Sequence, residues 1–118
     1  MDDSRPIFLQ IATSIEDQIL DGSLPEESQV PSINELAAFH RINPATALKG
    51  INVLVDANIL YKRRGIGMFV AAGAAQSLRH ARQASFKHQW VRPLTAQARA
   101  LDISPAQLCA MITEEMVS

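Results

Sequence analysis

The sequence predicts a mainly helical fold with a small β-hairpin wing, that is, a winged helix-turn-helix followed by a C-terminal helical dimerisation segment. Three observations favour this fold class. Apolar residues recur at helical spacing, two short helices are separated by a tight link, and two strand-like runs flank a turn with two glycines. We expect the winged domain to span residues 1–72 and the helical segment to span residues 73–118.

The first helix is expected to begin at Pro6, because proline suits the first helical position, where its missing N–H is no loss. Gly22 is expected to end it, as glycine commonly does just past a helix. Between them, isoleucines at every fourth residue predict the buried stripe of this helix: Ile7, Ile11, Ile15 and Ile19.

Local signals also bound the next two helices. Ser32 followed three residues later by Glu35 forms a capping box at a helix start. Asn43 and Pro44 restart a helix as its N-cap and first residue. Asn58 is expected to end this helix, since asparagine tolerates the left-handed conformation. The pair forms a candidate helix-turn-helix.

The elements that follow are a hairpin and further helices. Residues 59–63 and 68–71 are strand-like and flank a turn. Residues 74–100 have a helical pattern, with a kink or break expected near Arg92 because Pro93 disrupts helical hydrogen bonding. A second capping box, Ser104 with Gln107, starts the last helix.

The formal net charge of −1 argues against nucleic acid as a partner, but the charge is unevenly distributed. Residues 1–39 hold one base against eight acids, whereas residues 40–67 hold five bases against one acid. Phosphate binding depends on the local field, so residues 40–67 are a candidate phosphate-binding stretch. The alternative is a solvated face that balances its own charge.

Composition excludes several classes of protein. The 47% hydrophobic share is too high for a disordered chain, and no apolar run approaches the roughly 18 residues of a membrane span. The N-terminus lacks a secretory signal, so we expect a cytoplasmic protein. The single cysteine, Cys109, is expected to be buried and inert. The spacing of the histidines and the absence of a nucleophile motif predict no metal, no cofactor and no enzyme activity.

The second helix of the pair has the residue types to read DNA in the major groove. Asparagine pairs with adenine, threonine donates to bases or phosphate, and alanine contacts the thymine methyl. The candidates are Asn43, Ala45, Thr46 and, one turn later, Lys49. Asn43 is alternatively an N-cap only, and the two roles can coexist if its carbonyl caps while its amide donates to phosphate.

The hairpin tip carries three bases, Lys62, Arg63 and Arg64. Basic residues at such a tip can enter a minor groove or clamp phosphates. Gly65 and Gly67 permit positive φ and a close backbone approach. The alternative is a solvated turn with ordinary surface charges.

Taken in order, these motifs resemble the GntR-type winged-helix domain of bacterial transcription regulators, and most of all its YtrA-like subgroup. The resemblance covers a little over half of the chain and includes Pro6-Ile7-Phe8, Val30-Pro31-Ser32, Asn43-Pro44-Ala45-Thr46 and Arg64-Gly65-Ile66-Gly67-Met68-Phe69-Val70. It implies a homodimeric, sequence-specific DNA-binding regulator, often a repressor, on a two-fold symmetric operator. The positions that match family DNA contacts are Ser32, Asn34, Asn43, Ala45, Thr46, Lys49, Arg64, Gly65 and Ile66.

Three residues depart from the family pattern. Asn34 stands where arginine is usual, which changes the expected operator contact. Gly50 replaces a common alanine at a cost of about 1 kcal/mol in helix propensity, unless packing requires it. Asn58 replaces a common glycine as helix terminator.

The C-terminal segment is too short to enclose a ligand pocket and keep a core of its own. Its apolar stripes are therefore expected to pack on a second copy, although packing on the chain's own winged domain is an alternative. The predicted dimer residues are Leu78, Phe86, Trp90, Leu94, Leu101, Leu108, Met111 and Ile112. Two other functions stay open: a small-ligand sensor with a pocket at the dimer interface, and a winged helix that binds protein.

Overall fold

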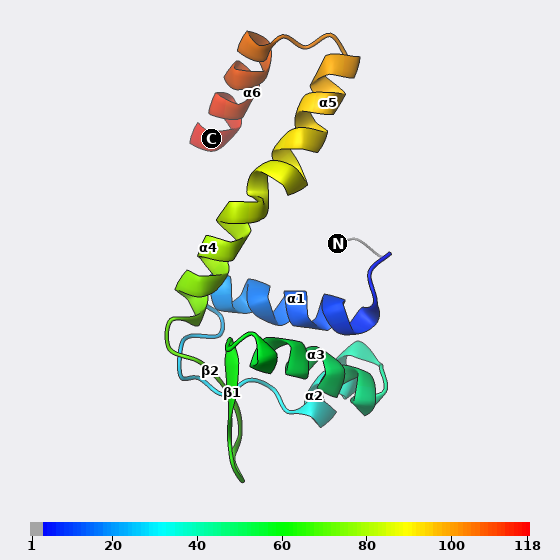
Figure 1. Ribbon diagram of the computed structural model, residues 1–118, viewed down its shortest axis with the longest axis vertical. Helices are drawn as coiled ribbons and strands as arrows, with labels where there is room; N and C mark the ends of the chain where they lie inside the picture. Colours follow the sequence, from blue (N-terminus) through cyan, green and yellow to red (C-terminus); the bar gives the residue numbers. More distant parts are fainter. Residues whose placement is uncertain (1–3) are drawn as a thin grey trace. The chain divides into compact units, whose positions relative to one another are not determined.

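The computed structural model describes residues 4–118, which form two compact units that meet at His80 and Ala81. The first unit contains α1 (Ile7–Leu20), α2 (Ile33–His40), α3 (Pro44–Asp56), β1 (Leu60–Arg63), β2 (Gly67–Val70) and the first turns of α4 (Ala74–Phe86) (Figure 1). The second contains the end of α4, the π-helical turn η1 (Lys87–Val91), α5 (Arg92–Ala100) and α6 (Pro105–Val117).

In the core of the first unit, α1 and α2 pack on α3. Buried residues of the hairpin and of the start of α4 belong to the same core. The predicted isoleucine stripe is confirmed at Ile11, Ile15 and Ile19, each at most 3% exposed. Ile7 was expected in the same stripe, but it is 54% exposed, because it is the first residue of α1 and lies at the edge of the core. The largest fully buried side chains are Ile51, Leu54, Leu60 and Val70.

The predicted helix boundaries are confirmed where local caps defined them. Ser32 and Glu35 form the reciprocal capping box of α2. The side chain of Asn43 caps α3 by accepting from the Ala45 N–H, and Asn58 follows the helix at φ 61°. Ser104 caps α6 with Gln107 in the same way. Each signal acts over two or three residues, which is why the sequence alone sufficed.

The hairpin pairs β1 with β2 antiparallel, with Leu60 opposite Val70 and Arg63 opposite Gly67. Residues 27–30, in the connection between α1 and α2, pair with the other edge of β2. Val30 N–H donates to Met68 O at 2.9 Å, and Val70 N–H donates to Ser28 O at 3.0 Å. The wing is therefore braced by a third short extended segment along β2.

The irregularity expected near Arg92 is present as a π-helical turn, so the backbone stays helical instead of breaking. The Arg92 N–H donates to the carbonyl of Lys87, five residues earlier. Pro93 has no N–H to offer to the preceding turn, and a wider turn accommodates its ring.

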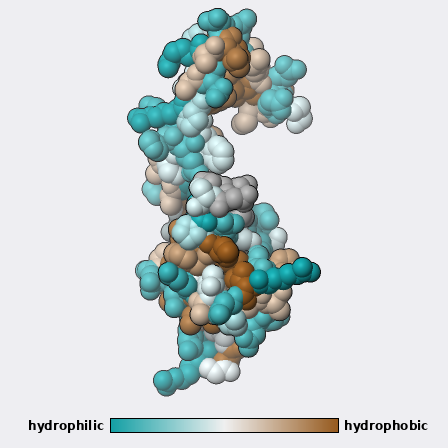
Figure 2. All heavy atoms as spheres, turned by 90° about the vertical axis from the view of Figure 1, so that its right-hand side faces the viewer, coloured by the Kyte–Doolittle hydropathy of each residue, from teal (hydrophilic) through white to brown (hydrophobic). Residues whose placement is uncertain are grey.

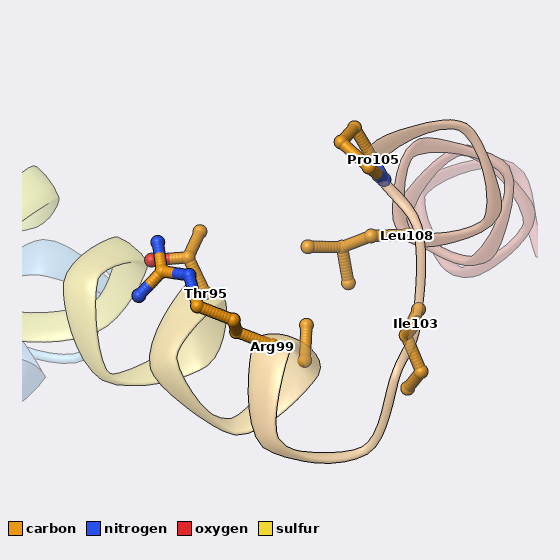
Figure 3. A pocket seen from close by; sticks show the side chains of 6 residues that line it. Thr95, Arg99, Ile103, Pro105 and Leu108 are labelled. Atoms are coloured by element: carbon orange, nitrogen blue, oxygen red, sulfur yellow. The ribbon is translucent and has the colours of Figure 1, made fainter.

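The second unit buries little of its apolar surface by itself. Ala98 on α5 is its only described residue that is less than 9% exposed. Leu108 points from α6 toward α5 across a shallow cleft that Thr95 and Arg99 line from the other side (Figure 3). Cys109 was expected to be buried, but it is exposed, because within one chain only the first turn of α6 meets α5.

Candidate nucleic-acid interface

One face of α3 is free of the core and presents the residues predicted to read bases. Ala47, Gly50, Ile51 and Leu54 are buried on the opposite side. Asn43, Ala45 and Lys49 are exposed, and Thr46 is half-buried. Helical periodicity therefore separates a packing face from a solvent face, and the sequence-predicted residues fall mainly on the latter.

Asn43 performs the capping role that the sequence left open. Its side-chain carbonyl oxygen accepts a hydrogen bond from the Ala45 N–H at 2.8 Å, so this oxygen serves as the helix cap. The amide NH₂ of the same side chain lies at the exposed start of the helix. The structure is thus compatible with the dual role in which the oxygen caps and the amide donates to another group.

Lys49 lies close to α1. Its Nζ lies 4.3 Å from the centroid of the Phe8 ring, so the ammonium rests over an aromatic face. The approach is close because Gly50 has no side chain: a Cβ there would lie 2.8 Å from Phe8 O and 3.2 Å from Ile11 Cβ. Packing therefore accounts for the glycine in α3, and it brings the Phe8 ring within reach of Lys49.

The start of α2 contributes Ser32 and Asn34, both exposed. The Ser32 hydroxyl accepts from the Glu35 N–H at 3.1 Å, and the Glu35 carboxylate accepts from the Ser32 N–H at 3.0 Å. The backbone hydrogen bond from Ser32, followed by the contribution of its hydroxyl, lowers the pKa of Glu35 below its ordinary value. Glu35 therefore keeps a negative charge beside Ser32 and Asn34, the two predicted DNA-contact residues of α2.

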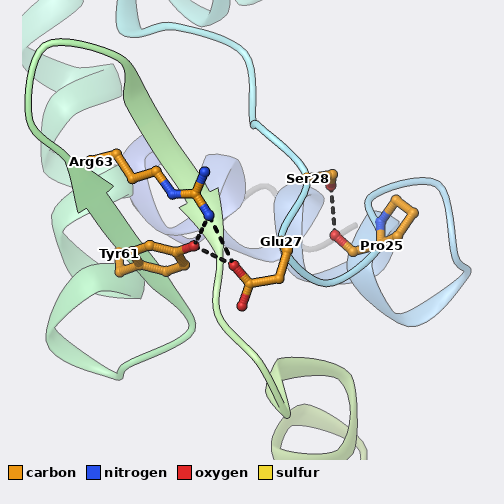
Figure 4. A network of polar contacts seen from close by, with 5 residues as sticks. All are labelled: Pro25, Glu27, Ser28, Tyr61 and Arg63. Atoms are coloured by element: carbon orange, nitrogen blue, oxygen red, sulfur yellow. Dashed lines mark hydrogen bonds and ion pairs between the residues drawn. The ribbon is translucent and has the colours of Figure 1, made fainter.

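The three predicted wing bases have different surroundings (Figure 4). Arg63 Nη2 lies 2.9 Å from the Tyr61 hydroxyl oxygen and 3.4 Å from Glu27 Oε2, and the Tyr61 hydroxyl donates to the same carboxylate oxygen. Its guanidinium also lies 4.3 Å from the centroid of the Phe69 ring. Arg63 therefore braces the wing, whereas Lys62 and Arg64 are exposed without belonging to this network.

Three residues that hold the wing, Tyr61, Glu27 and Gln29, were not predicted from the sequence. Tyr61 and Arg63 are two apart on a strand, so their shared face could have been anticipated. Glu27 and Gln29 lie more than 30 residues earlier, and no local pattern links them to the wing.

The hairpin tip projects beyond α2 and α3 on the side away from α1 (Figure 1). The tip turn is closed by the Ile66 N–H, which donates to Arg63 O at 3.0 Å, with Gly65 at φ 77°. The exposed start of α3, the start of α2 and the basic tip thus belong to one compact unit and offer hydrogen-bond donors and positive charge to a shared partner.

Among residues 4–118, no three histidine, cysteine, aspartate or glutamate side chains gather as metal ligands would. Within the same range, no helix has the length and apolar character needed to cross a membrane.

This arrangement of three helices and a hairpin is a winged helix-turn-helix. Residues 8–70 match the family described as bacterial regulatory proteins, gntR family. The chain therefore belongs to the GntR family, as the sequence motifs indicated, and this is a family of transcription regulators rather than of enzymes.

Similar proteins include both curated sequences and solved structures. The transcriptional repressor YtrA of Bacillus subtilis (strain 168) is 29% identical over 73% of this chain and 66% of its own length. A GntR-family regulator from Bacteroides thetaiotaomicron has a crystal structure with a TM-score of 0.74, at 34% identity over 94% of this chain and 96% of its own.

The DNA-binding domain of AraR, crystallised in complex with its operator ORR3, gives a TM-score of 0.54. It is 32% identical over 56% of this chain and 80% of its own. The chain spans 59% and 66% of the length of two of the curated relatives that it matches.

Proposed function

We propose that this protein is a homodimeric, sequence-specific DNA-binding regulator that represses transcription from a two-fold symmetric operator in the bacterial cytoplasm. The observation that carries the proposal is the exposed start of α3 beside a wing whose Lys62 and Arg64 are also exposed. The operator complex of the AraR domain and the name of YtrA as a repressor support it.

In this proposal, α3 enters the major groove and the wing reaches the neighbouring minor groove. Asn43, Ala45 and Thr46 contact base edges, while Ser32 and Asn34 contact the DNA backbone at the start of α2. Lys49, held over Phe8, contacts a phosphate at the edge of the groove. At the wing, Lys62, Arg64 and the tip residues Gly65, Ile66 and Gly67 contact DNA, and Arg63 positions them.

The first experiment is selection of bound sites from a random duplex library, followed by titration of the selected site at two salt concentrations. We expect an enriched site with two-fold symmetry and a dissociation constant that rises with salt, because phosphate contacts release counterions. A folded protein that enriches no site would refute operator binding and favour a winged helix that binds protein.

The dimer is proposed from the apolar side chains that the second unit leaves uncovered. Phe86, Trp90, Leu94, Leu101, Met111 and Ile112 are 42–67% exposed. Figure 2 shows apolar residues gathered on this unit, at the top of the view. Leu108 is half-buried against α5, and Leu78 is already buried in the core of the first unit, so we leave Leu78 out of the dimer face.

A second copy is the favoured occupant because a helical unit of this size cannot be stable with so little buried apolar surface. Leu94→Asp is expected to convert dimers to monomers in sedimentation velocity runs, whereas Ala96→Asp, which adds the same charge at an exposed position about 160° around α5 from Leu94, is not. If Leu94→Asp stays dimeric, α5 is not part of the interface.

A further inference from the structure

The tip of the wing carries an apolar side chain that the fold does not need. Ile66 is 62% exposed, although it sits between two glycines and beside the charged Arg64. An isoleucine that is 62% exposed gains little from burial within this chain. A role in recognising a partner would account for it.

The backbone of Ile66 is held by contacts within the wing. Its N–H donates to Arg63 O at 3.0 Å, and its carbonyl accepts from Gln29 Nε2 at 3.1 Å. What the tip presents outward is therefore the sec-butyl side chain and not the peptide donor.

Gln29 is able to hold the tip because Gly67 leaves room for it. A Cβ on Gly67 would lie 2.6 Å from Gln29 Nε2, and Gly67 has φ 149°, which few side chains allow. Gln29 is itself fixed by its bridge to Phe69, on the edge of β2. A chain of contacts from the third segment thus sets the position of Ile66.

We propose that Ile66 makes the wing selective for A·T base pairs by excluding the 2-amino group of guanine from the minor groove. This inference rests on the proposed operator binding, and it assigns the wing a base preference. In the minor groove, A·T and T·A pairs differ from G·C chiefly because guanine adds a protruding N2 amine. An isoleucine side chain over that amine removes its water and offers no acceptor in return.

The charges of the wing favour the same sequences. Lys62 and Arg64 precede Ile66 in the same hairpin and are exposed. A·T-rich minor grooves are narrow and carry a stronger negative potential, which attracts basic side chains inserted into them. Electrostatics then draw the wing to the groove, and Ile66 supplies the discrimination between base pairs.

The test changes only the minor-groove amine. In the selected site, each adenine in turn is replaced by 2,6-diaminopurine, which adds the amine and leaves the major-groove pattern unchanged. At the pairs under the wing we expect binding to weaken by roughly five- to 150-fold, the cost of a mismatched base pair. Replacing such an A·T pair by G·C should weaken binding likewise, and hypoxanthine in place of that guanine should restore it.

Three variants assign the effect to Ile66. Ile66→Ala should bring the ratio of dissociation constants on diaminopurine and adenine duplexes close to one. Gln29→Ala should lower the same ratio. A smaller folded fraction would raise both dissociation constants by the same factor, so it would leave this ratio unchanged. Arg64→Ala is the matched control: it should weaken both duplexes and reduce the salt slope by about one, while most of the ratio between them remains.

The outcomes separate this inference from the proposed function. If diaminopurine is tolerated at every position, or if Ile66→Ala leaves the ratio unchanged, the inference is overturned while operator binding stands. If the wild-type protein binds neither the natural nor the substituted duplex, both are overturned.

Discussion

Replacing Gly50 by alanine sets two physical effects against each other. In a helix interior, alanine is favoured over glycine by about 1 kcal/mol, so propensity predicts a more stable protein. In the structure, however, the new Cβ would lie 2.8 Å from the backbone oxygen of Phe8 and 3.2–3.3 Å from two atoms of the Ile11 side chain. A backbone oxygen cannot rotate away as the end of a side chain can.

The contact must therefore be relieved by moving α1 away from α3. Overpacking of this kind costs about 1–3 kcal/mol. The difference from the propensity gain gives an expected loss of roughly 1 kcal/mol in the free energy of unfolding, with limits of about 0 and 2. In a domain of this size, 1 kcal/mol corresponds to about 4–8 °C in melting temperature.

The assay is urea denaturation at fixed protein concentration, followed by far-UV circular dichroism. The slope should not change, because the same surface is exposed on unfolding. Asn52→Ala is the matched control, since Asn52 is exposed on the same helix and its replacement changes propensity without adding a packing contact. If Gly50→Ala stabilises the protein as much as Asn52→Ala or more, the close approach of α1 and α3 does not limit packing as argued.

Three further predictions concern the core, the capping box and α3. Leu54→Ala, at a side chain 1% exposed, should lower the free energy of unfolding by about 2–5 kcal/mol, whereas Leu48→Ala, 43% exposed on the same helix, should cost under half as much in the same denaturation assay. Hydrogen bonds with Ser32 lower the pKa of Glu35, so the ionised carboxylate stabilises the fold above the ordinary pKa of 4.5, and this stabilisation is lost as the pH falls through the lower folded value. In thermal melts between pH 7 and pH 3, the melting temperature of Glu35→Gln should therefore fall less with pH than that of the wild-type protein. Lys49→Ala should weaken binding to all duplexes alike and lower the salt slope by about one, and a loss confined to the selected site would show instead that Lys49 reads a base.

The sequence was sufficient wherever the determining interaction is local. The caps at Ser32, Asn43 and Ser104 each join atoms within three residues, and the structure has these helices starting where the caps place them. The glycine turn of the wing is likewise a short-range signal. These features belong to the chain before it folds, so one sequence reveals them.

What the sequence did not reveal depends on contacts between distant residues. The ion pair of Arg63 with Glu27 spans 36 residues, and the ring under Lys49 comes from a helix that lies far earlier in the chain. Both change the surroundings of a basic side chain: the ion pair holds Arg63 in the wing, and the Phe8 ring holds Lys49 beside α1 while Lys49 stays exposed. Periodicity showed that Ile7 and Cys109 lie on apolar stripes, but it could not show which part of a stripe another element covers.

The π-helical turn at Lys87–Val91 has a consequence for how this chain tolerates insertions and deletions. Each residue of an α-helix advances the rotation by 100°, since 3.6 residues make one turn. A turn that closes on the fifth residue instead of the fourth holds one residue more than an α-turn. Loss of a single residue there, with restoration of α-helical bonding, would leave the later side chains facing nearly as before, whereas loss of one residue from a regular α-helical stretch would turn them by about 100° around the helix axis. The turn at Lys87–Val91 is therefore the place in this segment where one codon can be lost without re-aiming the apolar surface beyond it.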